Sequence, residues 1–473
     1  MVPDWIQSGL SGLALVEREL LIFAAFWFVI GLADEFAIDL TYVWLRLTGR
    51  ARTQHLPTGY GRDPLGGDMA VLIPTYREAG VIATTIEHIL AAWPQHELRL
   101  YVGCYRNDTA TLDAAMAAAG RDSRVRLVVH GVAGPTTKAD CLNRLYRALC
   151  DDEARSGHRF RGILLQDAED MVHPAALQAV DAALGNVDFV QLPVRPAIDP
   201  SACWIGGHYA DEFTESHAKA MVVRNALGAA LPAAGVGCGF SRAALERLAQ
   251  RRLAEGEGGP FATECLTEDY ELGIELSRSG RGSAFLRLRD ADGALVATSS
   301  YFPARLDSAV RQKTRWVHGI ALQAWDRQGW TWSPIEFWMA LRDRRGPLTA
   351  LVLACAYLLL ILDGGLMALN LALGIKTVLP LSTPVRVMVM ISFAGFVWRA
   401  ASRALFTARE YGLAQGLRAV LRIPVANVIA IMAGRRAIGA YVLTLRGHAV
   451  VWDKTEHATH PAAPTVRLQT ART

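Results

Sequence analysis

Several common protein classes are excluded by what this 473-residue sequence lacks. Its seven cysteines form no Cys-x-x-Cys pair and are odd in number. Neither a tetrahedral zinc site nor a complete set of disulfides is therefore expected, and the thiols are predicted to be reduced in a cytosolic domain. No Gly-x-Gly-x-x-Gly follows a predicted strand, which argues against a dehydrogenase, and no P-loop motif occurs. The net charge is only +4, so no nucleic-acid partner is implied.

Apolar residues make up 52% of the chain and gather near the N-terminus and after about residue 346. The stretch 20–45 is long enough to cross the roughly 30 Å hydrocarbon core of a bilayer as a helix. Two further spans are predicted at about 348–373 and 379–397. Arginines follow the first span, precede the second and follow the third. The positive-inside rule then places residues 46–346 in the cytoplasm, as one domain inserted between membrane helices.

Two apolar segments carry charges. Asp34, Glu35 and Asp39 interrupt the first span, and they are expected to face protein or water because acidic groups are costly in lipid. The alternative is that Asp34 simply marks the end of the buried part. The last apolar stretch, 423–445, has Arg435 and Arg436 in its middle. An amphipathic or re-entrant interfacial helix is therefore favoured there over a fourth span.

The predicted organisation has four parts. Residues 1–50 form an N-terminal transmembrane helix, 51–330 a cytoplasmic domain, and 331–460 transmembrane and interfacial helices. Residues 461–473 form a disordered tail. Within the domain, short apolar runs at 69–73, 98–103, 125–129, 162–165 and 187–192 alternate with helical stretches. This alternation predicts an α/β fold whose parallel sheet is covered on both faces.

Parallel sheets of this kind bind ligands at the carboxyl ends of their strands. The candidate side chains are those that follow the first, second and fourth predicted strands: Thr75, Tyr76, Glu78, Asn107, Asp108, Asp167, Glu169 and Asp170. The acidic group 167–170 is typical of a Mg²⁺ or Mn²⁺ site, because clustered carboxylates need a positive partner and hard cations prefer oxygen ligands. The alternative is a solvated acidic turn that caps the next helix.

Two further motifs lie downstream. Glu268 and Asp269 begin an amphipathic helix, where one carboxylate would act as a general base or the pair would only favour the helix dipole. Gln312, Arg315 and Trp316 share one face of a predicted helix. A guanidinium there can neutralise a diphosphate, and an indole can stack on a sugar. The alternative for this third motif is an interfacial helix with aromatic anchors.

Taken in order, Pro-Thr-Tyr-x-Glu, Asn-Asp, Asp-Ala-Glu-Asp, Thr-Glu-Asp and Gln-x-x-Arg-Trp resemble family 2 glycosyltransferases of the cellulose-synthase type over residues 69–325. Stretches at 207–213, 234–240, 312–316 and 452–457 resemble the bacterial phage-adsorption protein B branch more closely. The resemblance implies a GT-A type (Rossmann-like) nucleotide-sugar-binding domain, in an enzyme of the bacterial inner membrane. It implies inverting transfer from a UDP-sugar to a growing cell-surface polysaccharide or a lipid acceptor. Membrane lipids and an outer-envelope protein are the other implied partners.

The resemblance also implies roles for individual residues. Asp167 and Glu169 would hold the metal, although many relatives have aspartate where Glu169 stands, so Asp170 would share or take that place. Asp269 would be the base, with Glu268 beside it. The donor would be bound by Thr75, Glu78, Asp108, Lys138, Asp167, Gln312, Arg315 and Trp316.

Two other functions and one regulatory site stay open. In the first alternative, the chain transfers a single sugar to a lipid carrier. In the second, it is a catalytically silent scaffold of an envelope complex that serves as a phage receptor. The pair Arg418 and Arg422 has the spacing that relatives use for cyclic dinucleotides. The same spacing recurs at Arg46/Arg50 and at 311/315, so chance explains it.

Overall fold

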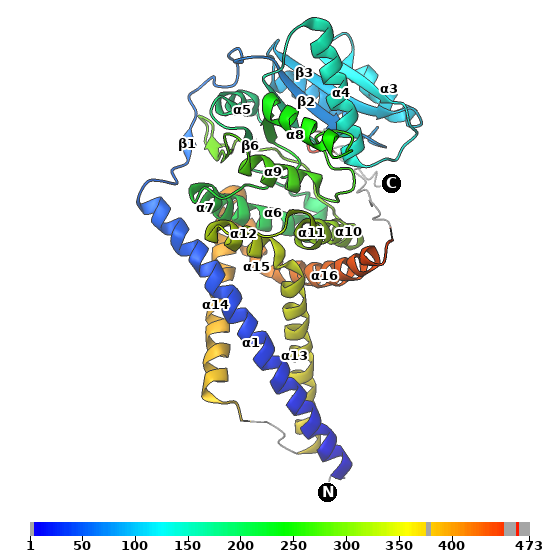
Figure 1. The fold of residues 1–473 in the computed structure, drawn as a ribbon. Helices are drawn as coiled ribbons and strands as arrows, with labels where there is room; N and C mark the ends of the chain where they lie inside the picture. Colours follow the sequence, from blue (N-terminus) through cyan, green and yellow to red (C-terminus); the bar gives the residue numbers. More distant parts are fainter. Residues whose placement is uncertain (1–3, 375–379, 449–459, 463–473) are drawn as a thin grey trace, which may run out of the picture.

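The computed structural model describes residues 4–374, 380–448 and 460–462 (Figure 1). Most of the predicted tail and the motif at 452–457 lie outside these residues. An α/β domain forms one end of the molecule, and three long helices project from it (Figure 1).

The centre of the domain is a seven-stranded mixed sheet with the order β4-β3-β2-β5-β7-β6-β8. Its strands are β2 (Met69–Pro74), β3 (Leu98–Tyr105), β4 (Val125–His130), β5 (Gly162–Leu165), β6 (Phe189–Gln191), β7 (Cys238–Ser241) and β8 (Ser283–Phe285). The five strands predicted from the sequence are confirmed, and β2 pairs in parallel with β3 and β5.

The prediction of a purely parallel sheet is wrong at β7, which runs antiparallel between β5 and β6. This strand escaped prediction because its four residues, Cys-Gly-Phe-Ser, include a glycine and do not form a continuous apolar run. The glycine is required by packing. A Cβ on Gly239 would lie 2.3 Å from Cγ1 of Val180 on the helix beneath the sheet.

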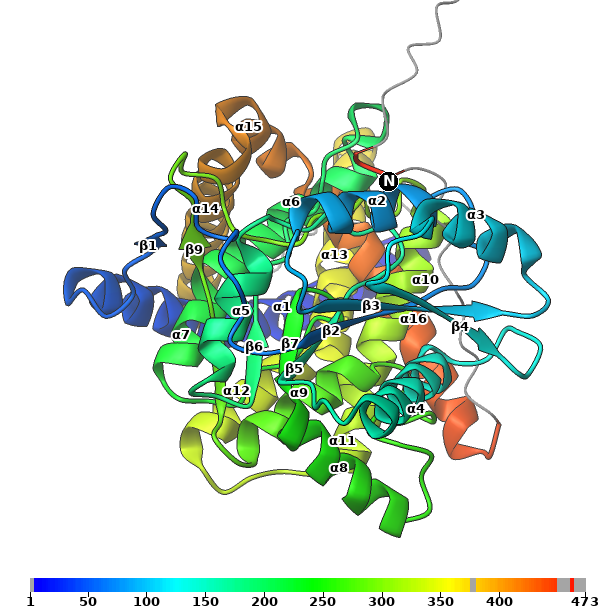
Figure 2. The same ribbon diagram turned by 90° about the horizontal axis from the view of Figure 1, so that it is seen from above.

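Helices cover both faces of the sheet, as predicted (Figure 2). On one face lie α2 (Ile82–Ala92), α3 (Thr109–Ala119) and α5 (Ala176–Leu184), and on the other α4 (Lys138–Ser156), α8 (Arg242–Ala254) and α9 (Glu268–Arg278). Strand β2 supplies alternate side chains to the two cores. Val71 and Ile73 pack on the first face and Leu72 on the second, all of them fully buried. Each such side chain contributes about 1.5–3 kcal/mol.

Among the residues that the structure describes, four helices are long and apolar enough to cross a membrane, by length and composition alone. They are α1 (Asp4–Leu47), α13 (Gly346–Leu373), α14 (Thr383–Tyr411) and α16 (Ile423–Leu445). The first three extend away from the domain, whereas α16 lies across their domain end (Figure 1). This arrangement is the one expected if α16 is interfacial, and the number of spans stays a prediction.

Shorter elements join the two parts. They are β1 (Gln54–His55), η1 (Pro200–Ala202), α6 (Ile205–Glu215), the π-helical η2 (Ser216–Ala220), α7 (Met221–Ala226), β9 (Leu288–Arg289), α10 (Leu306–Trp316), the π-helical η3 (Val317–Gln323), α11 (Ala324–Gln328), α12 (Pro334–Arg344) and α15 (Leu413–Leu421).

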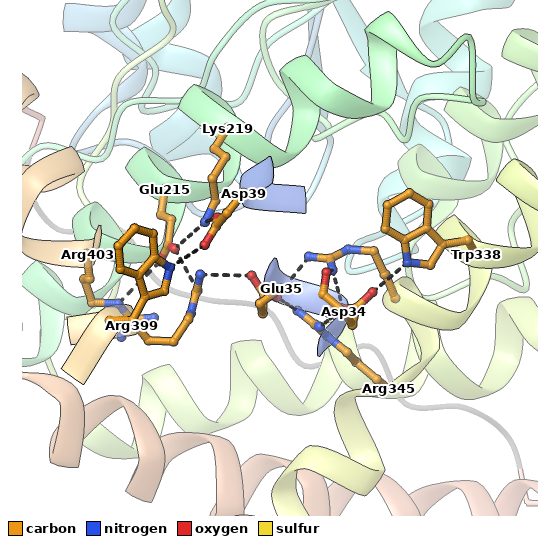
Figure 3. Close-up of polar contacts among 11 residues, drawn as sticks. Asp34, Glu35, Asp39, Glu215, Lys219, Trp338, Arg345, Arg399 and Arg403 are labelled. Carbon is orange, nitrogen blue, oxygen red and sulfur yellow. Dashed lines mark hydrogen bonds and ion pairs between the residues drawn. The ribbon is translucent and has the colours of Figure 1, made fainter. Parts of the chain in front are cut away.

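Asp34, Glu35 and Asp39 of α1 face protein, as predicted (Figure 3). Asp34 pairs with Arg345 at 2.6 Å and also with Arg342. Glu35 pairs with Arg345 at 2.5 Å and with Arg342 and Arg399 at 3.0 Å each. One carboxylate pair is thus compensated by guanidinium groups from two other parts of the chain, which offsets much of the cost of removing the charges from water.

Asp39, one turn further along α1, contacts a second group of charges (Figure 3). It pairs with Lys219 of η2 and accepts a 2.8 Å hydrogen bond from Nε1 of Trp398. Lys219 also pairs with Glu215 at 3.0 Å, and Glu215 pairs with Arg399 at 2.7 Å. The two groups of charges are therefore continuous through Arg399, and they attach the domain to both α1 and α14.

Candidate active site

A pocket opens where β2 and β5 end, and eight of the predicted site residues line it. These residues are Thr75, Tyr76, Glu78, Lys138, Asp167, Glu169, Gln312 and Arg315. They come from the loops after two parallel strands, from the start of α4 and from α10, which lies some 150 residues further along the chain. They therefore meet at the carboxyl ends of the strands, where parallel sheets of this kind bind ligands.

The loop after β2 forms one wall of the pocket. Thr75 donates a 2.7 Å hydrogen bond from Oγ1 to the carbonyl oxygen of Gly103 on β3. Arg77 has a φ of 54°, a conformation that costs free energy in a residue with a side chain. Its backbone N–H donates to the carboxylate of Asp108. Asp108 also caps α3, and it lies behind the loop rather than in the lining of the pocket.

The acidic cluster after β5 divides into two parts. Asp167 and Glu169 line the pocket, and Oδ1 of Asp167 lies 2.6 Å from Nζ of Lys138. Asp170 is fully buried and accepts a 2.7 Å hydrogen bond from the backbone N–H of Asp167 through Oδ2. Burial, with the charges of Asp167 and Glu169, raises the pKa of Asp170 well above its usual range. The pocket-facing pair is therefore Asp167 and Glu169, and Asp170 supports the loop from below.

These two carboxylates fit a divalent cation that arrives with a diphosphate. Within the described part of the chain, no group of three or more His, Cys, Asp or Glu side chains could hold a metal ion by itself. Mg²⁺ sites commonly use one or two protein carboxylates and complete their shell with substrate phosphates and water. Asp167 and Glu169 supply such a partial set.

Glu268 and Asp269 begin α9, close to Lys138. Burial, and then repulsion from Asp269, raises the pKa of Glu268 to about 7, and Lys138 and Arg315 oppose the rise. Burial also raises the pKa of Asp269. Glu268 is only 5% exposed, whereas Asp269 is half-buried. Of the two, Asp269 is therefore the one that a solvent-borne acceptor can approach.

Lys138 connects the two acidic groups. Burial alone would lower the pKa of this ammonium group, but Asp167, Glu268 and Asp269 together raise it above its usual range. The lysine stays charged as a result. Its position at the start of α4 is set by Thr137, whose Oγ1 accepts a 3.1 Å hydrogen bond from the backbone N–H of Asp140.

Gly235 makes the approach of Asp269 possible, and sequence reasoning did not single it out. A Cβ at Gly235 would lie 2.4 Å from Oδ2 of Asp269 and 3.4 Å from Nζ of Lys138. Its φ is +77°, which favours glycine in any case. The sequence signal at this position is the glycine-rich stretch 234–240, which resembles the phage-adsorption protein B branch but does not by itself indicate a contact with Asp269.

The helix α10 brings two of its three predicted residues to the pocket. Gln312 and Arg315 line it, and Oε1 of Gln312 and Nε of Arg315 are buried without a hydrogen-bond partner among the described residues. Buried polar atoms are usually satisfied, so these two are suited to a polar ligand. Trp316 instead packs against Tyr209 and Phe213, at ring-centroid distances of 6.0 and 6.1 Å. It is the one member of the motif outside the pocket lining.

Four lining residues lie outside the motifs predicted from the sequence: Tyr105, Thr136, Thr137 and Cys141. Thr137 carried a readable signal, because a threonine directly before a helical stretch is a common N-cap. Tyr105 reaches the pocket from the end of β3 and hydrogen-bonds Oγ1 of Thr136 at 2.5 Å. That contact joins segments 31 positions apart and has no local signature.

The cyclic-dinucleotide reading of Arg418 and Arg422 is not supported by their positions. Arg418 is exposed, but Arg422 is 1% exposed. Its Nη2 and Nε lie 2.6 and 2.7 Å from the two carboxylate oxygens of Asp211. A guanidinium held in a buried bidentate pair is not available to a second anion.

Known proteins resemble this chain over most of its length. The family model described as "Glycosyltransferase like family 2" matches residues 66–319, more than half of the chain. Bacteriophage adsorption protein B of Escherichia coli strain K12 is 32% identical over 483 residues, and so is bacteriophage N4 adsorption protein B of Escherichia coli O157:H7. Each alignment covers 96% of this chain, which spans 64% of the length of these relatives.

Two solved structures are similar at lower identity. The mannosyltransferase PcManGT from Pyrobaculum calidifontis, in complex with GDP-Man and Mn²⁺, is 17% identical with a TM-score of 0.48, covering 89% of this chain and 99% of its own. Glucosyl-3-phosphoglycerate synthase from Mycobacterium tuberculosis, in complex with Mn²⁺, UDP and phosphoglyceric acid, is 17% identical with a TM-score of 0.31. The match covers 51% of this chain and 73% of that one.

Proposed function

Because the chain belongs to the glycosyltransferase-like family 2, with the GT-A type fold predicted for it, we propose that it transfers a sugar from a UDP-sugar to a growing cell-surface polysaccharide. One observation carries the proposal. The pocket brings the pair Asp167 and Glu169 together with Lys138 and Arg315, and Asp269 lies beside Lys138. Carboxylates for a metal, cations for a diphosphate and a carboxylate of raised pKa are the groups that such a transfer needs.

In the proposed donor complex, the uridine lies along the loop after β2, against Thr75 and Glu78. Asp108 maintains this loop through the backbone of Arg77. Lys138 and Arg315 approach the diphosphate, while Asp167 and Glu169 hold Mg²⁺ or Mn²⁺. The metal, when bound, neutralises charge on the phosphate oxygens.

The proposed step is a single displacement that inverts the anomeric carbon. The acceptor hydroxyl oxygen forms a bond to this carbon as the bond from the carbon to the diphosphate oxygen breaks. Asp269 takes the hydroxyl proton, and UDP leaves with the bonding electron pair. Lys138 and Arg315 stabilise the negative charge that develops on UDP, in a pocket where preorganised cations act more strongly than in water.

The topology supports a cytoplasmic site in a bacterial inner membrane. The basic residues that follow α1, precede α13 and follow the apolar part of α14 all lie at the domain end of these helices (Figure 1). The positive-inside rule places that end in the cytoplasm, where nucleotide sugars are made. The proposal of a polysaccharide acceptor rests on the Gln-x-x-Arg-Trp motif, of which Gln312 and Arg315 line the pocket and Trp316 does not.

The test uses the full chain in membranes with a panel of radiolabelled UDP-sugars. The variant Asp269→Asn should reduce transfer by about 100-fold to 10,000-fold, because general-base catalysis commonly supplies factors of this size. UDP binding should be nearly unchanged. Asp151→Asn, at an exposed position on α4, is the matched control. Undiminished turnover in Asp269→Asn would overturn the base assignment, and a product confined to a lipid-extractable monosaccharide would overturn the polysaccharide acceptor.

A further inference from the structure

A second hollow lies where α1 ends against the domain, away from the donor pocket. It has a volume of about 140 Å³. Its lining includes four arginines, Arg46, Arg50, Arg52 and Arg287, and no carboxylate. Arg46 lies in the last turn of α1. Arg50 and Arg52 follow that helix, and Arg287 comes from the segment between β8 and β9. The other lining residues are contributed by α1, the segment directly after it, η2, α7 and β8.

The positive charge in this hollow is mostly uncompensated. Across residues 4–374, 380–448 and 460–462, Arg46, Arg50 and Arg52 form no ion pair with a carboxylate. Arg46 donates a 2.8 Å hydrogen bond to the carbonyl oxygen of Ala51, and the guanidinium of Arg50 lies 4.8 Å from the ring centroid of Trp44. These neutral contacts hold the side chains in place and leave their charge available to an anion.

Arg287 lies deepest in the hollow and is compensated only in part. It pairs with Glu410, which also pairs with Arg289 at 2.6 Å. One carboxylate therefore serves two guanidinium groups. Nε of Arg287 is buried with no hydrogen-bond partner among the described residues. An acceptor oxygen in the hollow would satisfy this donor, and buried donors are rarely left unsatisfied.

The outer face of α1 shows how deep this hollow lies in the membrane. Phe36, Leu40, Trp44 and Leu47 follow one another at helical spacing and are 47%, 56%, 47% and 83% exposed. An apolar stripe that continues to the last residue of α1 indicates that lipid contacts the helix up to its end. Tryptophan near the end of a membrane helix is typical of the headgroup level. Arg46, Arg50 and Arg52 are thus level with the lipid phosphates.

We propose that this hollow binds the phosphate of an anionic phospholipid headgroup from the cytoplasmic leaflet. The guanidinium groups present paired N–H donors to phosphate oxygens, a geometry that arginine provides and lysine only approximates. The bound lipid joins the end of α1 to the β8–β9 segment of the domain. This inference does not depend on sugar transfer, and its readout is lipid binding alone.

The experiment measures lipids retained by the full chain in nanodiscs of nine parts phosphatidylcholine and one part phosphatidylglycerol, by native mass spectrometry. The double variant Arg50→Gln/Arg52→Gln should bind the most tightly held phosphatidylglycerol about 30-fold more weakly, since each arginine near an anionic surface contributes about 1 kcal/mol. Both positions are exposed, so folding should be retained. The matched control is Arg435→Gln/Arg436→Gln, two exposed arginines of α16.

A second variant and a soluble anion complete the test. Arg50→Lys/Arg52→Lys keeps the charge but not the paired donors, and it should lose less affinity than the Gln variant. Equal losses in the Gln and Lys variants would assign the effect to packing on Trp44 and overturn the proposal, as would equal losses in the pocket and control variants. Inorganic phosphate is titrated in nanodiscs of phosphatidylcholine alone. Saturable binding of phosphate that is lost in the Gln variant, without retention of phosphatidylglycerol, would overturn the lipid source and support a soluble phosphate ligand.

Discussion

Replacing Gly235 by alanine tests the position of the proposed base without changing any charged group. The new Cβ would lie 2.4 Å from Oδ2 of Asp269, whereas an ordinary contact begins at 3.4 Å. The carboxylate must therefore move by about 1 Å, because the backbone at Gly235 is held in a short turn before β7. A displacement of about 1 Å in a reacting group can cost about 100-fold in rate, which corresponds to about 2.7 kcal/mol.

The assay is steady-state transfer from the UDP-sugar, with kcat and KM determined separately. The expected result is a kcat reduced about 100-fold with the donor KM within about twofold, because Asp269 does not line the nucleotide pocket. The same Cβ would be 3.4 Å from Nζ of Lys138, so the lysine need not move. Thermal unfolding should show only the cost of alanine at a positive φ, about 1–2 kcal/mol.

Gly157→Ala is the matched control for backbone strain. Gly157 has a φ of +70°, close to the +77° of Gly235, and an added Cβ there meets nothing within 4 Å. Both variants should therefore lose similar stability, and only Gly235→Ala should lose kcat. Equal kcat values in the two variants, or a raised KM with unchanged kcat in Gly235→Ala, would refute the placement of Asp269 at the reacting hydroxyl.

Three other predictions concern the metal, pH and the junction with the membrane. Chelation should stop transfer reversibly, with Mg²⁺ or Mn²⁺ restoring it; transfer that persists without metal would contradict the roles of Asp167 and Glu169. The raised pKa of Glu268, about 7 against an ordinary 4.5, stabilises the fold below pH 4.5, and this contribution is lost as the pH rises through 7. Glu268→Gln should flatten that part of the stability profile, because the amide does not titrate. An unchanged profile would contradict burial of the charge. Glu35→Gln should destabilise the detergent-solubilised chain by about 3 kcal/mol, because guanidinium groups lose a buried partner. The control Glu19→Gln, at an exposed position, should change the stability little. Equal melting temperatures of the two variants would contradict the network of Figure 3.

Several site residues were predictable because strand ends and helix starts are local features. Asp167 and Glu169 follow a four-residue apolar strand, and Lys138 begins a helix behind a threonine cap. A parallel sheet then brings the ends of its strands to one edge whatever the loops between them do. The order of five short motifs pointed to the family, and the family was confirmed.

Other features of the site could not be predicted, because they depend on which side of a loop or helix faces the pocket. The choice between Glu169 and Asp170 was open in the sequence. Asp170 turns inward because its carboxylate accepts the backbone N–H of Asp167. Trp316 turns to the aromatic side chains of α6 instead of the pocket. Helical spacing alone did not distinguish these two environments.

The α/β organisation and the long apolar helices that flank it follow from the sequence alone, since hydropathy, strand length and capping are properties of neighbouring residues. The charges of α1 were likewise expected to face something other than lipid. Their partners are set by the tertiary fold: Asp34 pairs with Arg345, 311 positions away. The same holds for β7 between β5 and β6, and for Gly235 against Asp269. Such contacts join distant segments, and their geometry is set by how whole elements pack, which no local pattern records.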